Sequence, residues 1–238
     1  RPRYSRMAWL VLVVALGVTA ALWVLSMRLV EDRTESRFNT QSLQLKTAIE
    51  DRLLNYEQVL AGSAGLFSVA GEIGREEWRT YIDKVNIDRY YPGIQGIGVT
   101  RRIDINELRG HLDELHAEGF EDYVVRPRGL RGEFHPIVYL EPATERNRRA
   151  FGYDAYQDEI HRQAMERARD TGRPVVTGKV VLVQEELAED QAGFLMYYPV
   201  YHGGQVPASL GERRILLKGF VFSAFRTNNL LDGIVGLI

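Results

Sequence analysis

The run MAWLVLVVALGVTAALWVLSM, residues 7–27, decides how this chain of 238 residues is organised. The run contains no charged residue. About 21 helical residues, each rising about 1.5 Å, span about 30 Å, which is the thickness of the hydrocarbon core of a bilayer. The sequence therefore predicts a transmembrane helix over residues 7–27, with a long polar segment after it.

The charges on either side of this run predict its orientation. Arg1, Arg3 and Arg6 precede it, whereas basic and acidic residues are mixed directly after it. Positive charge stays on the cytoplasmic side, so we expect residues 1–6 to form a cytoplasmic tail and the remainder to lie outside. A cleaved signal peptide is the alternative, but its apolar core is about 7–15 residues long and ends at small residues. The longer run favours an uncleaved anchor.

Composition narrows the function classes. The formal net charge is −2, which gives no indication of a nucleic-acid partner. The chain has no cysteine, which excludes disulfides, cysteine-ligated metals and thiol nucleophiles. A disulfide-free exported domain is ordinary in a bacterial periplasm, so we expect a periplasmic domain anchored in a bacterial inner (plasma) membrane. The chain begins with Arg1 and stops inside an apparent element, as a fragment of a longer protein would.

Residues 28–70 continue the helical pattern and form an expected stalk helix. Its apolar positions recur at steps near 3.5 residues, as in a coiled-coil seam. These positions are Phe38, Leu45, Ile49, Tyr56, Val59 and Leu66. Ser42, Arg52 and Ser63 interrupt the pattern, which leaves two readings: a parallel homodimer seam, or a helix packed on its own domain. Continuity with the membrane run favours a signalling stalk.

Further elements follow the stalk, with most of the helices before most of the strands. Helices are predicted from Arg75 to Asn86, from Asp104 to Gly119 and from Asp154 to Asp170. Strands are predicted at 94–100, 122–127, 135–140, 175–183, 193–201 and 215–225. This order predicts an α+β fold built on an antiparallel sheet.

Five phrases resemble a known module. They are Tyr91-Pro-Gly-Ile-Gln-Gly-Ile-Gly-Val, His135-Pro-Ile-Val-Tyr-Leu-Glu-Pro, Arg149-Ala-Phe-Gly-Tyr-Asp, Ala168-Arg-Asp-Thr-Gly and Gly193-Phe-Leu-Met-Tyr-Tyr-Pro-Val-Tyr. In this order and at these spacings they resemble the CHASE domain, an extracellular sensor of histidine kinases and cyclases. The resemblance covers roughly residues 75–231.

The resemblance implies a tandem arrangement of PAS-like domains after the long helix. A membrane-distal PAS-like sensor domain would occupy residues 71–204, and residues 205–238 would begin a truncated membrane-proximal one. The parent protein would be a two-component histidine kinase or a diguanylate or adenylate cyclase, with a second membrane helix before its output domain. This region itself would bind a ligand, with no catalytic residue, metal or cofactor.

The ligand of such a sensor would be a small molecule. The residues expected to line its site are Tyr139, Glu141, Pro142, Tyr153, Asp154, Thr177, Lys179, Tyr197 and Tyr198. We expect a cavity beside Thr177, Tyr139 and Glu141. Along 194–199, alternate side chains face opposite sides of the strand, so Tyr197 and Tyr198 cannot both line it.

The resemblance also argues against one ligand. In the plant cytokinin receptors an Asp holds the adenine-like ring from the position that corresponds to Pro142, and a Thr corresponds to Thr177. Proline has neither an N–H nor a carboxylate to pair with a purine edge. The adjacent Glu141 should point the other way. We therefore predict that a cytokinin is not the ligand.

Two other readings remain open. A filled core in place of a cavity would indicate an ectodomain that recognises a periplasmic protein. A hydrolase is disfavoured, because neither Gly-x-Ser-x-Gly nor His-Glu-x-x-His occurs. Arginines cluster at 126, 128 and 131 and again at 146, 148 and 149, where they either capture an anion or lie in solvated loops.

Overall fold

The computed structural model describes residues 3–71, 73–129, 131–182 and 192–226. The chain divides into two compact units, residues 1–51 and residues 52–238. Helix α1, Arg3–Ala70, supplies the described part of the first unit and the start of the second.

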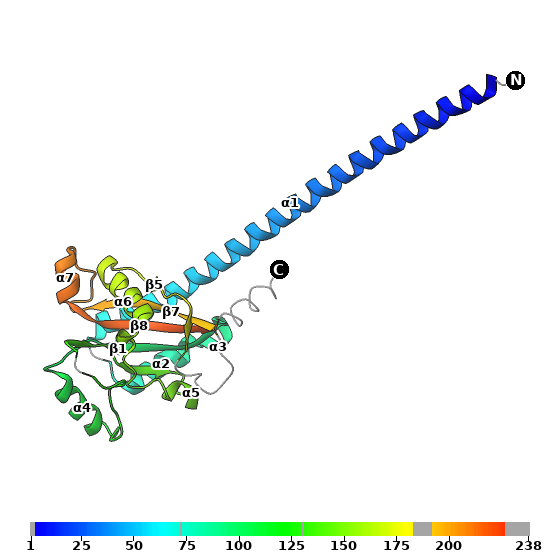
Figure 1. The fold of residues 1–238 in the computed structure, drawn as a ribbon. Coiled ribbons are helices and arrows are strands. Elements are labelled where there is room, and N and C mark those ends of the chain that lie inside the picture. Colours follow the sequence, from blue (N-terminus) through cyan, green and yellow to red (C-terminus); the bar gives the residue numbers. More distant parts are fainter. Residues whose placement is uncertain (1–2, 72, 130, 183–191, 227–238) are drawn as a thin grey trace. The chain divides into compact units, whose positions relative to one another are not determined.

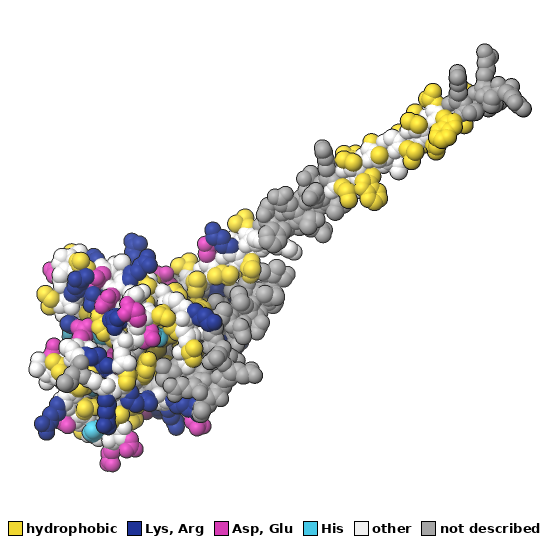
Figure 2. Space-filling view, viewed as in Figure 1, with side chains coloured by type: hydrophobic (Ala, Val, Ile, Leu, Met, Phe, Trp, Pro, Cys, Tyr) yellow, Lys and Arg dark blue, Asp and Glu magenta, His cyan; other side chains and the backbone are white. Residues whose placement is uncertain are grey.

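The first unit contains the apolar run. Met7–Met27 is helical, has a mean hydropathy of 2.5, and buries none of its side chains against the protein. Apolar side chains project from it along the side seen in Figure 2. By length and composition, this segment can cross a bilayer.

The second unit is built on one antiparallel sheet (Figure 1). Its strands run in the order β4-β1-β8-β7-β5, and β6 pairs with β7. The bounds are β1 Ile94–Arg101, β4 Ile137–Glu141, β5 Val175–Val176, β6 Val180–Val181, β7 Ala192–Tyr201 and β8 Leu217–Arg226. A separate two-stranded ladder joins β2, Ile103–Asp104, to β3, Glu133–Phe134. The fold class is therefore the predicted α+β arrangement on an antiparallel sheet.

Short helices connect and cover these strands. They are α2 Arg75–Val85, α3 Ile87–Tyr90, α4 Leu108–Ala117, α5 Glu145–Arg148, the 3₁₀ helix η1 Ala155–Gln157, α6 Glu159–Thr171 and α7 Leu210–Ile215. Helix α6 has clear end signals. The carboxylate of Asp158 accepts hydrogen bonds from the amides of Ile160 and His161, and Gly172 ends the helix at a φ of 68°.

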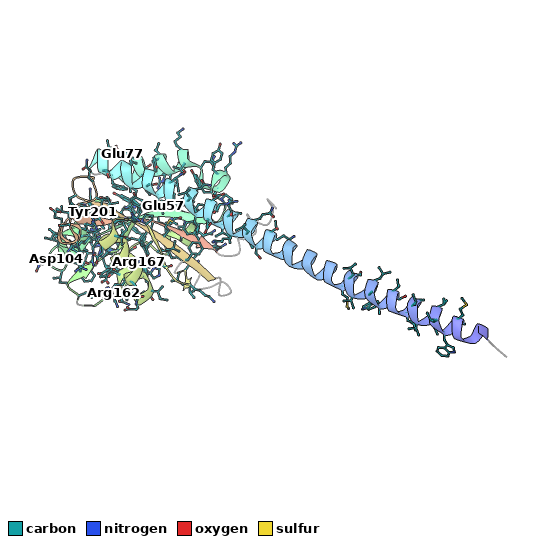
Figure 3. The ribbon with its side chains drawn as sticks, turned by 90° about the horizontal axis from the view of Figure 1, so that it is seen from above. Glu57, Glu77, Asp104, Arg162, Arg167 and Tyr201 are labelled. Atoms are coloured by element: carbon teal, nitrogen blue, oxygen red, sulfur yellow. The ribbon has the colours of Figure 1, made fainter. Side chains whose placement is uncertain are left out.

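The strand register separates two faces of the sheet. On β8, Phe220 and Phe222 share a buried cluster with Met165 of α6. Phe225 points to the other face, where its ring centroid lies 4.8 Å from that of Tyr56 on α1. Helix α6 therefore covers one face, and residues 52–70 of α1 together with α2 cover the other. Figure 3 shows Glu77 of α2 and Arg162 of α6 on opposite sides of the sheet.

The predicted boundary between two PAS-like domains, at residue 204/205, falls between two neighbouring strands of one sheet. Strand β8 lies between β1 and β7, and it pairs with both along most of its length. Residues 217–226 are thus the centre of the same sheet, not the start of a second one. Residues 227–238 lie outside the described residues.

The last turns of α1 also belong to this unit. Tyr56 and Leu60 are 0% exposed, and Val59 and Phe67 are buried. Residues 52–70 therefore form a helix that packs on its own domain, which is one of the two arrangements that the sequence left open. The dimer seam stays a prediction for the part of the stalk before residue 52.

Several predicted elements differ in detail. Residues 122–127 form only a bridge, between Arg126 and Tyr153. The predicted strand at 175–183 is interrupted, because the hydroxyl of Thr177, rather than a backbone carbonyl, accepts the Leu195 amide. Helix α4 begins at Leu108, since Asp104 pairs with Glu133 in the small ladder. Asp154 caps η1 and not α6.

Candidate functional site

A narrow cavity lies on the face of the sheet that α6 covers. Its volume is about 20 Å³, which is room for about one water molecule. It is lined by Ile137, Ala150, Tyr153, Ala155, His161, Val181, Leu182, Leu195 and Phe222. We call it the α6 pocket. Of the nine predicted site residues, only Tyr153 lines it directly.

Tyr197 and His161 form the polar contact next to this pocket. The phenol oxygen of Tyr197 lies 2.9 Å from Nδ1 of His161, and both side chains are buried. Burial lowers the pKa of His161 and raises that of Tyr197 well above its ordinary value. The pair is therefore uncharged at neutral pH.

Asp154 is close to the same pocket, but its carboxylate accepts hydrogen bonds from backbone amides. Its side chain is 0% exposed, and Oδ1 accepts hydrogen bonds from the amides of His135 and Tyr156 at 2.9 and 3.2 Å. Nη2 of Arg131 lies 3.1 Å from Oδ2, without the alignment of a hydrogen bond. Asp154 thus joins the segment before β4 to η1.

The hydroxyl of Thr177 also makes its hydrogen bonds within the protein. Its hydroxyl donates to the carbonyl of Gly178 at 2.8 Å and accepts from the amide of Leu195 at 2.9 Å. It follows β5 at one edge of the sheet, and the neighbouring Lys179 is exposed.

Tyr139 and Glu141 lie on the opposite edge strand and the opposite face. Tyr139 donates from its hydroxyl to the carbonyl of Ile73 at 3.0 Å, and Nε of Arg79 lies 3.4 Å from Oε1 of Glu141. By its pairing with Val221, Tyr198 faces the same side. The carbonyl of Pro142 accepts from the side chain of Asn147 at 2.9 Å.

The nine candidate residues therefore do not converge. Between β4 and β5 lie three other strands, and four spacings of about 4.8 Å separate the edges by roughly 19 Å. The expected single cavity beside Thr177, Tyr139 and Glu141 is not found in the part of the chain that the structure describes. Tyr153, Asp154, Thr177 and Tyr197 gather on the α6 side, whereas Tyr139, Glu141 and Tyr198 lie on the other.

A larger cavity, of about 200 Å³, lies on the Tyr139 side at the ends of the strands. We call it the strand-end cavity. It is lined by Phe67, Ile73, Gly74, Val99, Thr100, Arg101, Glu114, Glu118, Val138, Tyr139, Val200, Lys218, Gly219 and Phe220. Sequence reasoning missed all of these but Tyr139, because five or more separate elements supply them. The one local signal is the four-residue spacing of Glu114 on α4 and Glu118 at its C-terminal cap.

Arg75 packs against the ring of Tyr139, which lines the strand-end cavity. Its guanidinium carbon lies 4.3 Å from the ring centroid of Phe120 and 4.9 Å from those of Tyr139 and Phe151. Nη1 donates to the carbonyl of Val138 at 3.0 Å, and Nη2 lies 3.7 Å from Glu118. Burial lowers the pKa of Arg75 from its ordinary value. This cation fixes the start of α2 against the sheet domain.

Two of the clustered arginines hold loops in place. Arg126 donates to the carbonyls of Arg149 and Phe151, and Arg131 donates to Gln157 and to the carbonyl of Pro127.

Within the described ranges, no three His, Asp or Glu side chains lie close enough together to hold a metal ion.

Comparisons with known proteins place these features in context. The family model described as the CHASE domain matches residues 71–237. A search of curated proteins finds no match. Among solved structures, the chain is similar to the ligand-binding domain of the Pseudomonas aeruginosa PAO1 amino acid chemoreceptor PctC in complex with GABA. That similarity has a TM-score of 0.43 at 14% identity, over 79% of this chain and 59% of that one.

Proposed function

The chain belongs to the CHASE family of extracellular sensor domains, and from this we propose that it is the ligand-sensing region of a membrane-bound signal-transduction receptor. One observation carries the proposal: the family match at residues 71–237 coincides with the described antiparallel-sheet domain. The parent protein would add a cytoplasmic output domain, a histidine kinase or a diguanylate cyclase, whose activity the sensor controls.

The apolar segment Met7–Met27 supports membrane anchoring. It exposes apolar side chains along a length that fits the hydrocarbon core, and arginines precede it. With the N-terminus in the cytoplasm, the sheet domain faces the periplasm. The stalk helix then connects sensor and membrane, and we propose that its residues before 52 pair with those of a second copy.

The α6 pocket is the proposed ligand site. Tyr153 and His161 line it, Tyr197 adjoins it, and Thr177 lies on the same face. Aromatic walls with a few polar atoms are the usual make-up of a small-molecule site. Because His161 and Tyr197 are uncharged at neutral pH, an uncharged polar group on the ligand would suit them. The pocket must widen from about 20 Å³ to admit a ligand.

Signalling follows from that widening. A ligand shifts a conformational equilibrium only by its differential affinity for the two states. If a compound binds only the wider state, occupancy moves α6 away from β7 and β8, whose other face carries residues 52–70 of α1. The same sheet thus connects the pocket to the stalk.

A second candidate function is recognition of a periplasmic protein. The small volume of the α6 pocket favours it, and so does an open groove between α1 and α2, lined mainly by apolar surface. Leu66, Ala70, Ile73 and Tyr81 contribute to that groove.

A ligand screen separates the two functions. The full chain in detergent is heated with purines, amino acids and organic acids, each at saturating concentration. A true ligand at about 100 times its Kd adds about 2.7 kcal/mol of stability, which raises the Tm by roughly 5 °C or more. Substitution of Tyr153 by Ala should abolish that rise, whereas Tyr90→Phe, on an exposed side chain, should preserve it. No rise with any compound would count against the small-molecule function.

A further inference from the structure

The strand-end cavity is a second site, distinct from the α6 pocket. It opens on the face that α1 and α2 cover, and it contacts Phe67 near the end of α1. Ile73 and Gly74, in the connection from α1 to α2, complete that wall. The two cavities are lined by different residues, so each can be altered without touching the other.

Both positively and negatively charged side chains line the strand-end cavity. Arg101 ends β1 and Lys218 lies near the start of β8, and the pairing of Arg101 with Gly219 makes the two cations neighbours. Glu114 lies on α4, and Glu118 is the residue that caps its C-terminal end, four positions later, so both side chains extend from the same side of that helix end. The cations therefore come from the sheet, and the carboxylates come from α4 and its C-terminal cap.

In this structure Arg101 donates a hydrogen bond to Glu114, and Lys218 donates one to the backbone carbonyl of Gly71. Nη1 of Arg101 lies 2.8 Å from Oε2 of Glu114, but the side chains are 34% and 49% exposed. Glu118 is 3.7 Å from Arg75, beyond hydrogen-bond distance. Ion pairs this exposed contribute little to stability, so a ligand that supplies its own charges can take their place.

Apolar side chains line the cavity as well, beside Thr100 and Tyr139. They belong to Phe67, Ile73, Val99, Val138 and Val200. A cavity of about 150 Å³ accommodates benzene, so about 200 Å³ accommodates roughly eight or nine non-hydrogen atoms.

We propose that the strand-end cavity binds a small zwitterion with an apolar body. Its carboxylate would contact Arg101 and Lys218, its ammonium group would contact Glu114 and Glu118, and its apolar part would pack against Val99 and the other apolar side chains. Because Phe67, Ile73 and Gly74 form one wall, occupancy would stabilise the end of the stalk helix. The proposal goes beyond the α6 pocket and does not depend on it.

Three matched probes test the charge requirement. L-leucine carries both charges, 4-methylpentanoate lacks the ammonium group, and 3-methylbutylamine lacks the carboxylate. Their binding to the full chain in detergent is measured by isothermal titration calorimetry. Leucine should bind, and each analogue should bind at least tenfold more weakly. Equal binding of all three, or no binding of leucine at millimolar concentration, would overturn the proposal.

Two double variants locate the site. Arg101→Gln with Glu114→Gln removes one charge of each sign together and leaves neither partner alone, and it should weaken leucine binding at least tenfold. The matched control is Arg162→Gln with Glu159→Gln, an exposed pair on α6. The control should bind leucine as the unaltered chain does, and circular dichroism checks that both variants fold. Lys218→Gln, a single change at one of the two cations, should also weaken binding.

Substitutions in the α6 pocket distinguish the two proposals. If Tyr153→Ala abolishes leucine binding while the Arg101/Glu114 double variant retains it, leucine occupies the α6 pocket. The inference about the strand-end cavity then fails and the proposed sensor function stands.

Discussion

Tyr197 on β7 and His161 on α6 are joined by a 2.9 Å contact between the phenol oxygen and Nδ1, the polar link between the sheet and the helix that covers it. Both groups are buried. Burial lowers the pKa of His161 and raises the pKa of Tyr197, so that each side chain is held in its neutral form. A neutral hydrogen bond beside a narrow cavity is a contact that a ligand can replace.

Removal of the phenol hydroxyl tests this link. Tyr197→Phe leaves the buried His161 nitrogen without its partner, which should lower the free energy of unfolding by about 1–3 kcal/mol. Urea titration of the full chain measures the change. Tyr90→Phe, at a 61% exposed position, should alter it by less than about 0.5 kcal/mol. Equal effects of the two substitutions would contradict the role of the link.

Acid should destabilise the sheet domain through His111. Burial, with a further contribution from Arg101, lowers the pKa of His111 to about 4, whereas Glu114 opposes that shift. The pKa of a histidine in the unfolded chain is about 6.5. As the pH falls, the unfolded state therefore binds a proton on His111 before the folded state does. Stability should therefore fall as the pH drops from about 6.5 to about 4, by roughly 2–3 kcal/mol from this group.

His111→Gln checks that assignment. Glutamine is uncharged and can still pair with the hydroxyl of Tyr123, which lies 3.0 Å from Nε2 of His111. Thermal unfolding measured at several pH values should show a smaller loss over this window for the variant. Burial lowers the pKa of His161 in the same direction, so part of the loss should remain. An identical pH profile for variant and unaltered chain would disprove the assignment.

Buried side chains in the last turns of α1 should contribute to the stability of the sheet domain, as residues of its hydrophobic core do. Leu60 is 0% exposed, so Leu60→Ala should lower the free energy of unfolding of the sheet domain by about 2–5 kcal/mol. Leu43→Ala, on the same helix but 64% exposed, is the matched control and should change it by less than about 0.5 kcal/mol. Denaturant unfolding reports both. A small effect at Leu60 would mean that residues 52–70 are not part of the domain.

Self-association should depend on the earlier part of the stalk. Phe38→Glu or Ile49→Glu places a charge in the proposed seam and should shift the chain toward monomer in analytical ultracentrifugation. Gln44→Glu adds the same charge at an exposed position on the outer side of the helix, away from the seam, and should leave the oligomeric state unchanged. If neither seam substitution changes the sedimentation coefficient, the dimer proposal fails.

The sequence predicted the local features of the fold well. Gly172 ends α6, the central strands lie where alternating apolar residues occur, and the apolar run is one helix. It did not predict how β8 pairs. Thr100 and Phe220 are opposite each other although 120 residues separate them in the chain, and no local signal encodes such a pairing.

The lack of a local signal for long-range pairing also explains which parts of the site could not be predicted. Alternation along residues 194–199 placed Tyr197 and Tyr198 on opposite faces, and the structure agrees. Alternation cannot show which strand lies at which edge, so Tyr139 and Thr177 were expected together although three strands separate them. The strand-end cavity escaped prediction because its charged residues come from β1, α4 and β8.

The central claim is that a small molecule is sensed beneath α6. A crystal structure of the full chain with a compound that raises its Tm tests this claim most directly. The account predicts that the compound lies between α6 and the sheet, in contact with Tyr153 and His161, in a cavity wider than about 20 Å³. An unchanged α6 pocket, with the compound bound only elsewhere, would contradict it.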